Sequence, residues 1–287
     1  MENTGLINLQ YVNTVIKERP RDIHKGQCGR VLTVAGSVGM AGAAVLCTEA
    51  ALKSGAGLVK AAVPGELFTI LQIAVPQATC MCISDKDFLR SLKQSDAVAL
   101  GPGMGVGEDK YLLIEKILNE FDGPVVVDAD GLTNLCRFGK KTDILKNHNK
   151  IILTPHPGEC DRILESLDEE NIKAMGRIRA AEIVSERTGA VVLLKGADTV
   201  VTKSLKGTYI NTTGNPGMAT GGSGDVLTGL IAAIAASGTD VFDAAKTGAY
   251  IHGLAGDIAA DRCGQRGMTS VDIKDSLPVA FKMIIGK

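Results

Sequence analysis

The sequence contains no tryptophan, and aromatic residues make up only 3% of its 287 positions. With so few rings, platforms on which nucleobases could stack are scarce. There is also no excess of basic charge, because 31 Lys and Arg face 32 Asp and Glu for a net charge of −1. Proteins that bind nucleic acid or acidic membranes carry a basic surface. We therefore expect neither nucleic acid nor a membrane as the main partner.

The seven cysteines include no pair spaced Cys-x-x-Cys. That spacing is typical of structural zinc sites, and an odd, scattered set does not indicate a disulfide framework, so we assign the thiols to packing. No apolar run approaches the 18 residues of a membrane-spanning helix, and the first residues lack the basic and apolar regions of a signal peptide. We expect a reduced, cytoplasmic, globular protein.

Glycine, by contrast, is abundant: it accounts for 34 of the 287 residues, whereas its usual share is about 7%. The glycines separate short runs of β-branched residues or Leu from helix-like segments. Runs of this kind without polar alternation fit strands that are covered on both faces, as in a parallel sheet. Strands are predicted at residues 31–35, 58–63, 97–100, 124–127, 151–153 and 190–194.

Helices are predicted between these strands, for example at residues 41–54 and 110–119. Alternation of strands and helices with short turns favours an α/β fold with a mainly parallel central sheet and helices on both faces. Residues 199–203 and 208–211 indicate an antiparallel hairpin, and helices over about 225–237 and 243–260 follow it. No linker or charge run divides the chain, so we expect a single domain over residues 1–287.

Glycines and polar side chains follow the predicted strands. In open α/β sheets, ligands bind outside the carboxyl ends of the strands. The segments at those ends are 36–39, 101–105, 128–130, 154–159 and 195–199. We expect one cleft at this edge, lined by Gly36, Gly103, Asp128, His156 and Gly224.

The most informative segment is Gly-Gly-Ser-Gly-Asp at 221–225, directly before an apolar helix. Free N–H groups at a helix start, together with the helix dipole, favour phosphate, and glycines leave access to them. The alternative is that Asp225 only caps the helix, but a cap needs no glycine cluster. If phosphate binds here, Asp225 lies within reach of a group attached to it and could act as a base.

Four further side chains have a functional and a structural interpretation. His156 lies between two prolines, which predicts an extended, rigid loop and favours a functional role. Glu159 is either a first-turn helix residue or a group that orients hydrated Mg²⁺. Lys195, before Gly196, is either a surface lysine or a phosphate partner. His252 lies among helical glycines suited to close packing, and we interpret it as structural.

Two common nucleotide motifs are missing. No Gly-x-x-x-x-Gly-Lys-[Ser/Thr] sequence is present, which excludes a P-loop protein. No Gly-x-Gly-x-x-Gly opens a helix, so a hydride-transferring Rossmann site is not supported.

With these residues assembled, the chain resembles the ADP/ATP-dependent NAD(P)H-hydrate dehydratases of the ribokinase-like superfamily. The resemblance runs in order from about residue 20 to the end. The combination of Thr-Pro-His-Pro-Gly-Glu with Gly-Gly-Ser-Gly-Asp is specific, whereas sugar kinases of the superfamily usually carry Gly-Ala-Gly-Asp and Asn-x-x-Glu. The matching stretches are 24–26, 35–37, 42–44, 101–103, 128–130, 154–159, 192–196, 211–217 and 221–225.

The resemblance implies a repair reaction. Hydrated (S)-NADHX or (S)-NADPHX is dehydrated to NADH or NADPH while ADP or ATP is cleaved to AMP or ADP and phosphate. It also implies Mg²⁺, a homotetramer and a separate NAD(P)HX epimerase as a functional partner. It assigns Asp225 as the base, Glu159 to the metal, and the hydrated dinucleotide to Ala43, Gly103, His156 and Asp225. The residues assigned to the adenine nucleotide are Lys195, Gly196, Ala197, Asp198, Thr199, Gly222, Ser223 and Gly224.

Two other functions compete with this one. A small-molecule kinase of the same superfamily, acting on a thiamine-precursor alcohol, would share the glycine-rich helix start and the Asp base. It would be expected to carry Asn where this chain has His156. A nucleotide-binding regulator without catalysis would need the glycines of 221–224 but not Asp225.

Overall fold

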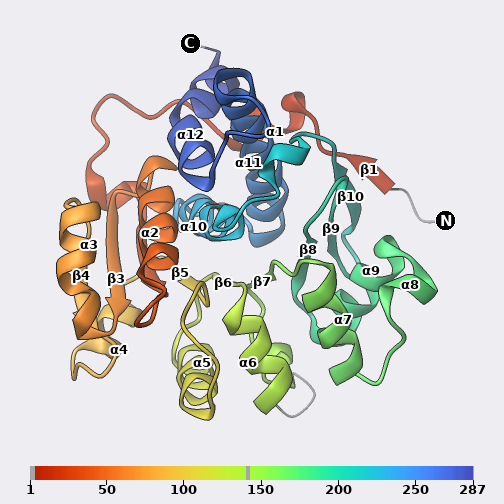
Figure 1. Ribbon diagram of the computed structural model, residues 1–287, viewed down its shortest axis with the longest axis horizontal. Coiled ribbons are helices and arrows are strands. Elements are labelled where there is room, and N and C mark those ends of the chain that lie inside the picture. Colours follow the sequence, from red (N-terminus) through yellow and green to blue (C-terminus); the bar gives the residue numbers. More distant parts are fainter. Residues whose placement is uncertain (1–3, 140–142, 287) are drawn as a thin grey trace.

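The computed structural model describes residues 4–139 and 143–286. In these residues ten strands form one sheet, in the order β1-β10-β9-β8-β7-β6-β5-β2-β3-β4 (Figure 1). All six predicted strands belong to it, as β2, β3, β5, β6, β7 and β8. The strands are β1 Thr4–Leu6, β2 Arg30–Val34, β3 Leu58–Val63, β4 Thr79–Cys82, β5 Ala97–Leu100, β6 Val125–Val127, β7 Ile151–Leu153, β8 Val191–Leu194, β9 Thr199–Lys203 and β10 Gly207–Asn211.

The sheet is mainly parallel, as predicted. Strands β2 to β8 pair in parallel, whereas β9 runs antiparallel to both β8 and β10 and forms the predicted hairpin. The register is level across the centre, because Val34 lies beside Leu100, Leu100 beside Val127, and Val127 beside Leu153. The carboxyl ends of four neighbouring strands therefore meet along one edge.

Helices cover both faces of the sheet, and each face has its own apolar core. Figure 1 shows α10, α11 and α12 on one side and α5, α6 and α7 on the other. The first core also includes α1, α2 and α3, and the second includes α4 and α9. The helices are α1 Leu9–Val15, α2 Ala41–Lys53, α3 Phe68–Ala74, α4 Phe88–Lys93, α5 Glu108–Glu120, α6 Asp130–Phe138, α7 Pro157–Ser166, α8 Ile172–Met175, α9 Arg177–Thr188, α10 Ser223–Ala236, α11 Val241–Cys263 and α12 Ser270–Ile285.

Helix α10 lies at the centre of the first core, and every residue from Val226 to Ala236 is buried. It packs against α2 so closely that a Cβ at Gly229 would lie 2.1 Å from the carbonyl oxygen of Cys47. A helix buried on all sides has a fixed position. The amino end of α10 is thereby held at the carboxyl edge of the sheet.

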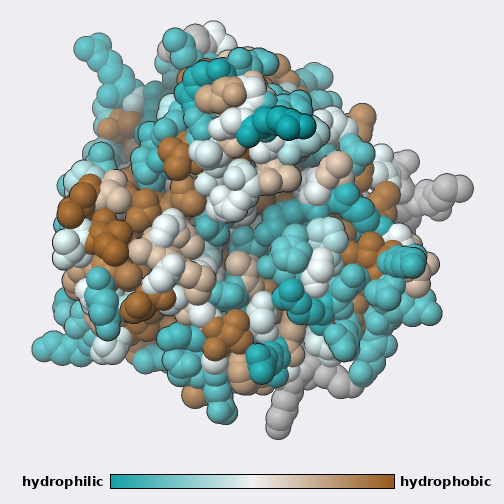
Figure 2. All heavy atoms as spheres, in the orientation of Figure 1, coloured by the Kyte–Doolittle hydropathy of each residue, from teal (hydrophilic) through white to brown (hydrophobic). Residues whose placement is uncertain are grey.

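The structure differs from the sequence prediction at the margins. Strands β1 and β4 were not predicted, and both are short edge strands. Helix α11 is longer than the predicted 243–260. The exposed hydrophobic side chains include Val38, Met40, Ile70 and Ile73. Figure 2 shows hydrophobic surface on the side where α3 lies in Figure 1. None of the helices in the described ranges is long and apolar enough to cross a membrane.

Candidate functional site

Helix α10 begins at a glycine turn that no side chain caps. Gly222 is the N-cap residue, with a φ of 87° that favours glycine, and a Cβ there would lie 2.5 Å from Cδ1 of Leu46. The helix predicted over about 225–237 is confirmed, and it begins two residues earlier, at Ser223. Asp225 lies in the first turn and not at the N-cap, which removes the capping alternative.

A buried ion pair lies directly beside this helix start. Lys195 Nζ donates to Asp128 Oδ1 at 2.6 Å, and Asp128 Oδ2 accepts from the hydroxyl of Thr228 at 2.9 Å. Asp128 is only 1% exposed. A Cβ at Gly224 would lie 3.1 Å from Asp128 Oδ2 and 3.2 Å from Lys195 Nζ. Glycine at this position therefore lets the helix start approach the charged pair.

Lys195 does not lie at a solvent-open edge as expected of a surface lysine, because its side chain is only 20% exposed. Burial by itself lowers the pKa of this ammonium group. The carboxylates of Asp128 and Glu159, the latter 3.7 Å away, raise the pKa more, so that Lys195 stays protonated. The ammonium group of Lys195 thus balances the charge of buried carboxylates, whether or not it also contacts a ligand.

The carboxyl group of Asp225 has an environment suited to proton transfer. Burial, followed by the negative charges of Asp128 and Asp130, raises its pKa from 3.8 to about 6, while Lys195 acts in the opposite direction. A base works best when its pKa lies near the operating pH, and perturbed carboxyls of this kind are typical of active sites.

His156 and Glu159 hold each other at the start of α7. His156 is the N-cap residue: its backbone N–H donates to Glu159 Oε2 at 2.8 Å, and its Nδ1 accepts from the backbone N–H of Glu159 at 3.3 Å. His156 itself is extended, but the loop expected around it ends at once, because the helix begins at Pro157. The imidazole is half exposed, whereas Glu159 is buried.

A cavity of about 670 Å³ opens beside the start of α10. This volume falls within the range of small-molecule sites. One wall is the loop of Lys195, Gly196, Ala197, Asp198 and Thr199, which we call the 195–199 loop, and another is the segment 211–219. His156, Ser223 and Gly224 also line the cavity, so the structure brings these predicted residues together.

The single cleft predicted for five residues divides into two parts. Gly36 and Gly103 do not line the cavity, and Asp128 lies buried beneath it. Gly36 and Gly103 belong instead to two joined loops, because the Gly36 amide donates to the carbonyl of Pro102 at 2.8 Å. A Cβ at Gly103 would lie 2.8 Å from Cβ of Ala43, so these two predicted substrate residues are in contact. Gly36 and Gly103 lie at the same sheet edge as the cavity, in the loops after β2 and β5.

Sequence reasoning missed two contributors to the cavity. The first is the segment 211–219, of which residues 211–217 were matched to the family but given no site role. Asp257 holds this segment, because its carboxylate accepts from the backbone amide of Gly214 and from the side-chain amide of Asn215. His252 was interpreted as purely structural, yet it lines the cavity, with Nε2 3.5 Å from Ser223 Oγ. Burial lowers the pKa of His252 to about 4, which keeps the ring neutral. No local motif signalled either contact.

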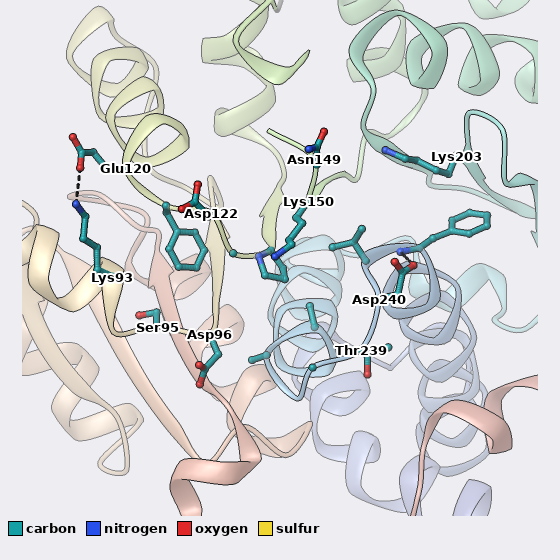
Figure 3. A pocket seen from close by; sticks show the side chains of 18 of the residues that line it. Lys93, Ser95, Asp96, Glu120, Asp122, Asn149, Lys150, Lys203, Thr239 and Asp240 are labelled. Carbon is teal, nitrogen blue, oxygen red and sulfur yellow. Dashed lines mark hydrogen bonds and ion pairs between the residues drawn. The ribbon is translucent and has the colours of Figure 1, made fainter. Parts of the chain in front are cut away.

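A larger cavity, of about 1100 Å³, lies at the opposite edge of the sheet (Figure 3). Its walls come from segments that precede β5, β6 and β7 and from the carboxyl end of α10. Two of its lysines are paired with carboxylates, Lys93 with Glu120 at 2.9 Å and Lys206 with Asp240 at 3.2 Å. None of the predicted site residues lines this cavity.

Fold and site together define a class. This is a mainly parallel α/β protein in which an uncapped, glycine-rich helix start lies beside a nucleotide-sized cavity, with a perturbed carboxyl group in the first helical turn. The sequence profile of one family, the NAD(P)H-hydrate dehydratases, matches residues 31–279. The chain belongs to this family.

Relatives of known family lead to the same assignment. The chain is 40% identical to the bifunctional NAD(P)H-hydrate repair enzyme of Moorella thermoacetica, over 98% of this chain and 54% of the relative. It is 37% identical to the ADP-dependent (S)-NAD(P)H-hydrate dehydratase of Neisseria meningitidis, over 87% of this chain and 83% of the relative. The chain thus spans about half the length of the bifunctional relatives that it matches.

Solved structures confirm the ribokinase-like fold. The ADP/ATP-dependent NAD(P)H-hydrate dehydratase of Bacillus subtilis, co-crystallised with ATP/Mg²⁺, superimposes with a TM-score of 0.85 at 28% identity, over 99% of this chain and 100% of that one. A ribokinase-like superfamily protein of Enterococcus faecalis gives a TM-score of 0.87 at 24% identity. A hydroxyethylthiazole kinase of Pyrococcus horikoshii shares the fold more distantly, with a TM-score of 0.63 at 16% identity.

Proposed function

We propose that this chain dehydrates (S)-NADHX or (S)-NADPHX to NADH or NADPH, at the expense of ADP or ATP, and releases AMP or ADP and phosphate. The observation that carries the proposal is Asp225. Its carboxyl group has a pKa raised to about 6 and lies in the first turn of an uncapped helix. Asp225 does not itself line the cavity of nucleotide size, but the preceding residue, Gly224, does. Family membership supplies the substrate class.

The nucleotide occupies the 670 Å³ cavity in this proposal. Its contacts are the 195–199 loop and the helix start at Gly222, Ser223 and Gly224, of which Ser223 and Gly224 line the cavity. The Ser223 amide already donates to the carbonyl of Thr220 at 3.3 Å, so the backbone N–H groups of Gly222 and Gly224 are the ones that meet the phosphates in this proposal. The hydrated dinucleotide contacts Ala43 and Gly103 on one side of the helix start and His156 on the other. Because Ala43 touches Gly103, this pair offers a small-residue surface against which a flat ligand can lie.

Hydroxide is a poor leaving group, so the hydroxyl of the hydrated ring must first be phosphorylated. Asp225 accepts the hydroxyl proton, and the new P–O bond forms as the anhydride P–O bond to the nucleotide breaks. The C–O bond then breaks with release of phosphate, and the neighbouring ring carbon loses a proton to water, which forms the C=C bond of the product. The backbone N–H groups of Gly222 and Gly224 stabilise the negative charge on the phosphoryl group during transfer.

Glu159 fits a role towards Mg²⁺. Asp128 has both carboxylate oxygens engaged, whereas in the described residues Oε1 of Glu159 has only the His156 ring within ion-pair range, at 3.6 Å. The described residues contain no group of three ligating side chains. This suits Mg²⁺, which keeps waters and binds through phosphates and one or two carboxylates. Bound in this way, the ion would neutralise phosphate charge.

We also propose a single ribokinase-like domain that acts in the cytoplasm as a homotetramer with a separate epimerase. One sheet holds all strands of the described residues, and the seven cysteines are free thiols, which suits a reducing compartment. The exposed hydrophobic side chains near α3 offer a surface for self-association. The word bifunctional in the relatives' names supports a second, coupled activity.

One assay tests the function. The protein is incubated with (S)-NADHX and ADP or ATP, and absorbance at the NADH wavelength is followed together with AMP or ADP release. Stoichiometric NADH and nucleotide product support the proposal. Phosphorylation of a thiamine-precursor alcohol without NADH formation would identify a kinase instead. Nucleotide binding by calorimetry without turnover of either substrate would identify a regulator.

A further inference from the structure

Arg177, the first residue of α9, is bound to the backbone of the 195–199 loop and not to a carboxylate. Its Nη1 donates to the carbonyl of Ala197, and its Nη2 lies 3.2 Å from the carbonyls of both Leu194 and Lys195. No carboxylate of the described residues forms an ion pair with it. Hydrogen bonds from a charged donor are about twice as strong as neutral ones, so Arg177 is the main tether of the loop.

The tether fixes which backbone groups face the cavity. Lys195 and Ala197 turn their carbonyls to Arg177, and Gly196 turns its carbonyl to the hydroxyl of Thr199 at 2.8 Å. The amides of Gly196, Ala197 and Asp198 have no acceptor among the described parts of the chain. These three residues line the cavity, so their N–H groups are left for a ligand.

The loop is held in a conformation that a free chain avoids. Gly196 has a φ of 138° and Asp198 a φ of 53°, both in regions that L side chains rarely adopt. A Cβ at Gly196 would lie 2.9 Å from Nη2 of Arg177, so the guanidinium fits closely against the loop. Backbone of this kind persists only where its surroundings determine it.

The hydrogen bonds of this arginine to the loop come with an uncompensated polar group. Its Nε is buried and has no acceptor in the described residues, which costs free energy. Arg179, two residues further along the same helix, is by contrast exposed and paired with Glu182 and Glu186. Arg177 therefore leaves an unneutralised positive charge behind the loop, and this favours an anionic ligand in front of it.

We propose that Arg177 is a positioning residue for nucleotide binding: it holds the 195–199 loop so that three backbone N–H groups face the adenine nucleotide. The inference rests on the proposed function, because it concerns the nucleotide cavity of the same site. Arg177 does not line that cavity, so it acts through the loop and not by touching the nucleotide.

The test compares Arg177→Met and Arg177→Lys with Arg179→Met and Arg179→Lys as matched controls on the same helix. For each variant, the Kd of ADP is measured by calorimetry, and kcat and KM are measured with ADP and (S)-NADHX. We expect Arg177→Met to raise Kd and KM for ADP about tenfold to a hundredfold, the equivalent of one charge-assisted hydrogen bond. Lysine keeps the charge but cannot reach three carbonyls, so Arg177→Lys falls between.

A change in ADP affinity without a change in kcat separates positioning from a merely structural role. We expect kcat at saturating ADP and KM for (S)-NADHX to stay within about threefold of wild type, and both Arg179 variants to be unchanged, since surface ion pairs contribute little. An ADP affinity within twofold of wild type in Arg177→Met, or a lowered kcat with unchanged affinity, would overturn the inference. Should that variant not fold, Arg177→Lys decides by the same criteria. Failure of the wild type to turn over (S)-NADHX would refute the proposed function, while ADP binding would still decide on Arg177.

Discussion

Replacing Asp225 with Asn tests the proposed base most directly. Asn matches Asp in size but cannot accept the proton of the substrate hydroxyl. Turnover should therefore fall by roughly 10²–10⁴, the usual contribution of a positioned general base. Binding of ADP should persist or tighten, because a negative charge next to the phosphates is removed.

Stability should move in the opposite direction. The carboxyl pKa of Asp225 rises from 3.8 to about 6 on folding, chiefly through burial. Ionising this group at neutral pH costs the native state about 1–3 kcal/mol, after allowance for partial exposure and the favourable helix start. Since the N-cap is Gly222, no cap is lost in the variant. We expect Asp225→Asn to melt about 2–6 °C higher than wild type at pH 7.

The pH dependence gives a second readout of the same group. A raised carboxyl pKa stabilises the native state below the unfolded pKa of 3.8, and this contribution is lost as pH rises through about 6. The stability difference between variant and wild type should thus appear above pH 6 and vanish near pH 4. Wild-type kcat should rise through about pH 6 to a plateau. An Asn variant that keeps more than about a tenth of wild-type kcat would mean that another group is the base.

Three further predictions concern the neighbours of Asp225. Lys195→Met should lower the free energy of unfolding by about 3–5 kcal/mol in urea titrations, because buried Asp128 loses its counter-charge, and it should also weaken ADP binding; an unchanged midpoint would contradict the ion pair. Gly224→Ala should lower kcat/KM for ADP at least about tenfold with little change in Tm, since its Cβ would lie 3.2 Å from Lys195 Nζ. The pKa of His252 falls from 6.5 to about 4 on folding, so its contribution is present above pH 6.5 and is lost as pH falls towards 4. Between pH 7 and pH 4, wild type should therefore lose about 3 kcal/mol more stability than His252→Gln does. A variant whose stability falls with pH as in wild type would refute a buried neutral ring.

The central strands could be predicted from the sequence because each is an apolar run buried on both faces and bounded by a turn. The predicted bounds of β3, β5, β7 and β9 agree with the structure to the residue. The edge strands β1 and β4 could not be predicted, since Thr-Gly-Leu and Thr-Cys-Met-Cys carry no strand pattern. Only pairing with β10 and β3 makes them strands.

The same division holds at the site. The sequence determined which chemical groups follow the strands: the glycines before α10, the carboxyl group of Asp225 and the motif around His156. The tertiary structure decided their partners, since Lys195 and Asp128 are 67 positions apart and meet only because β6 and β8 flank β7. It also decided that the guanidinium of Arg177 meets backbone carbonyls, and it decided which pKa values shift. Local pattern fixes an element and the residue types at its ends, whereas burial and pairing depend on segments that only the folded sheet brings together.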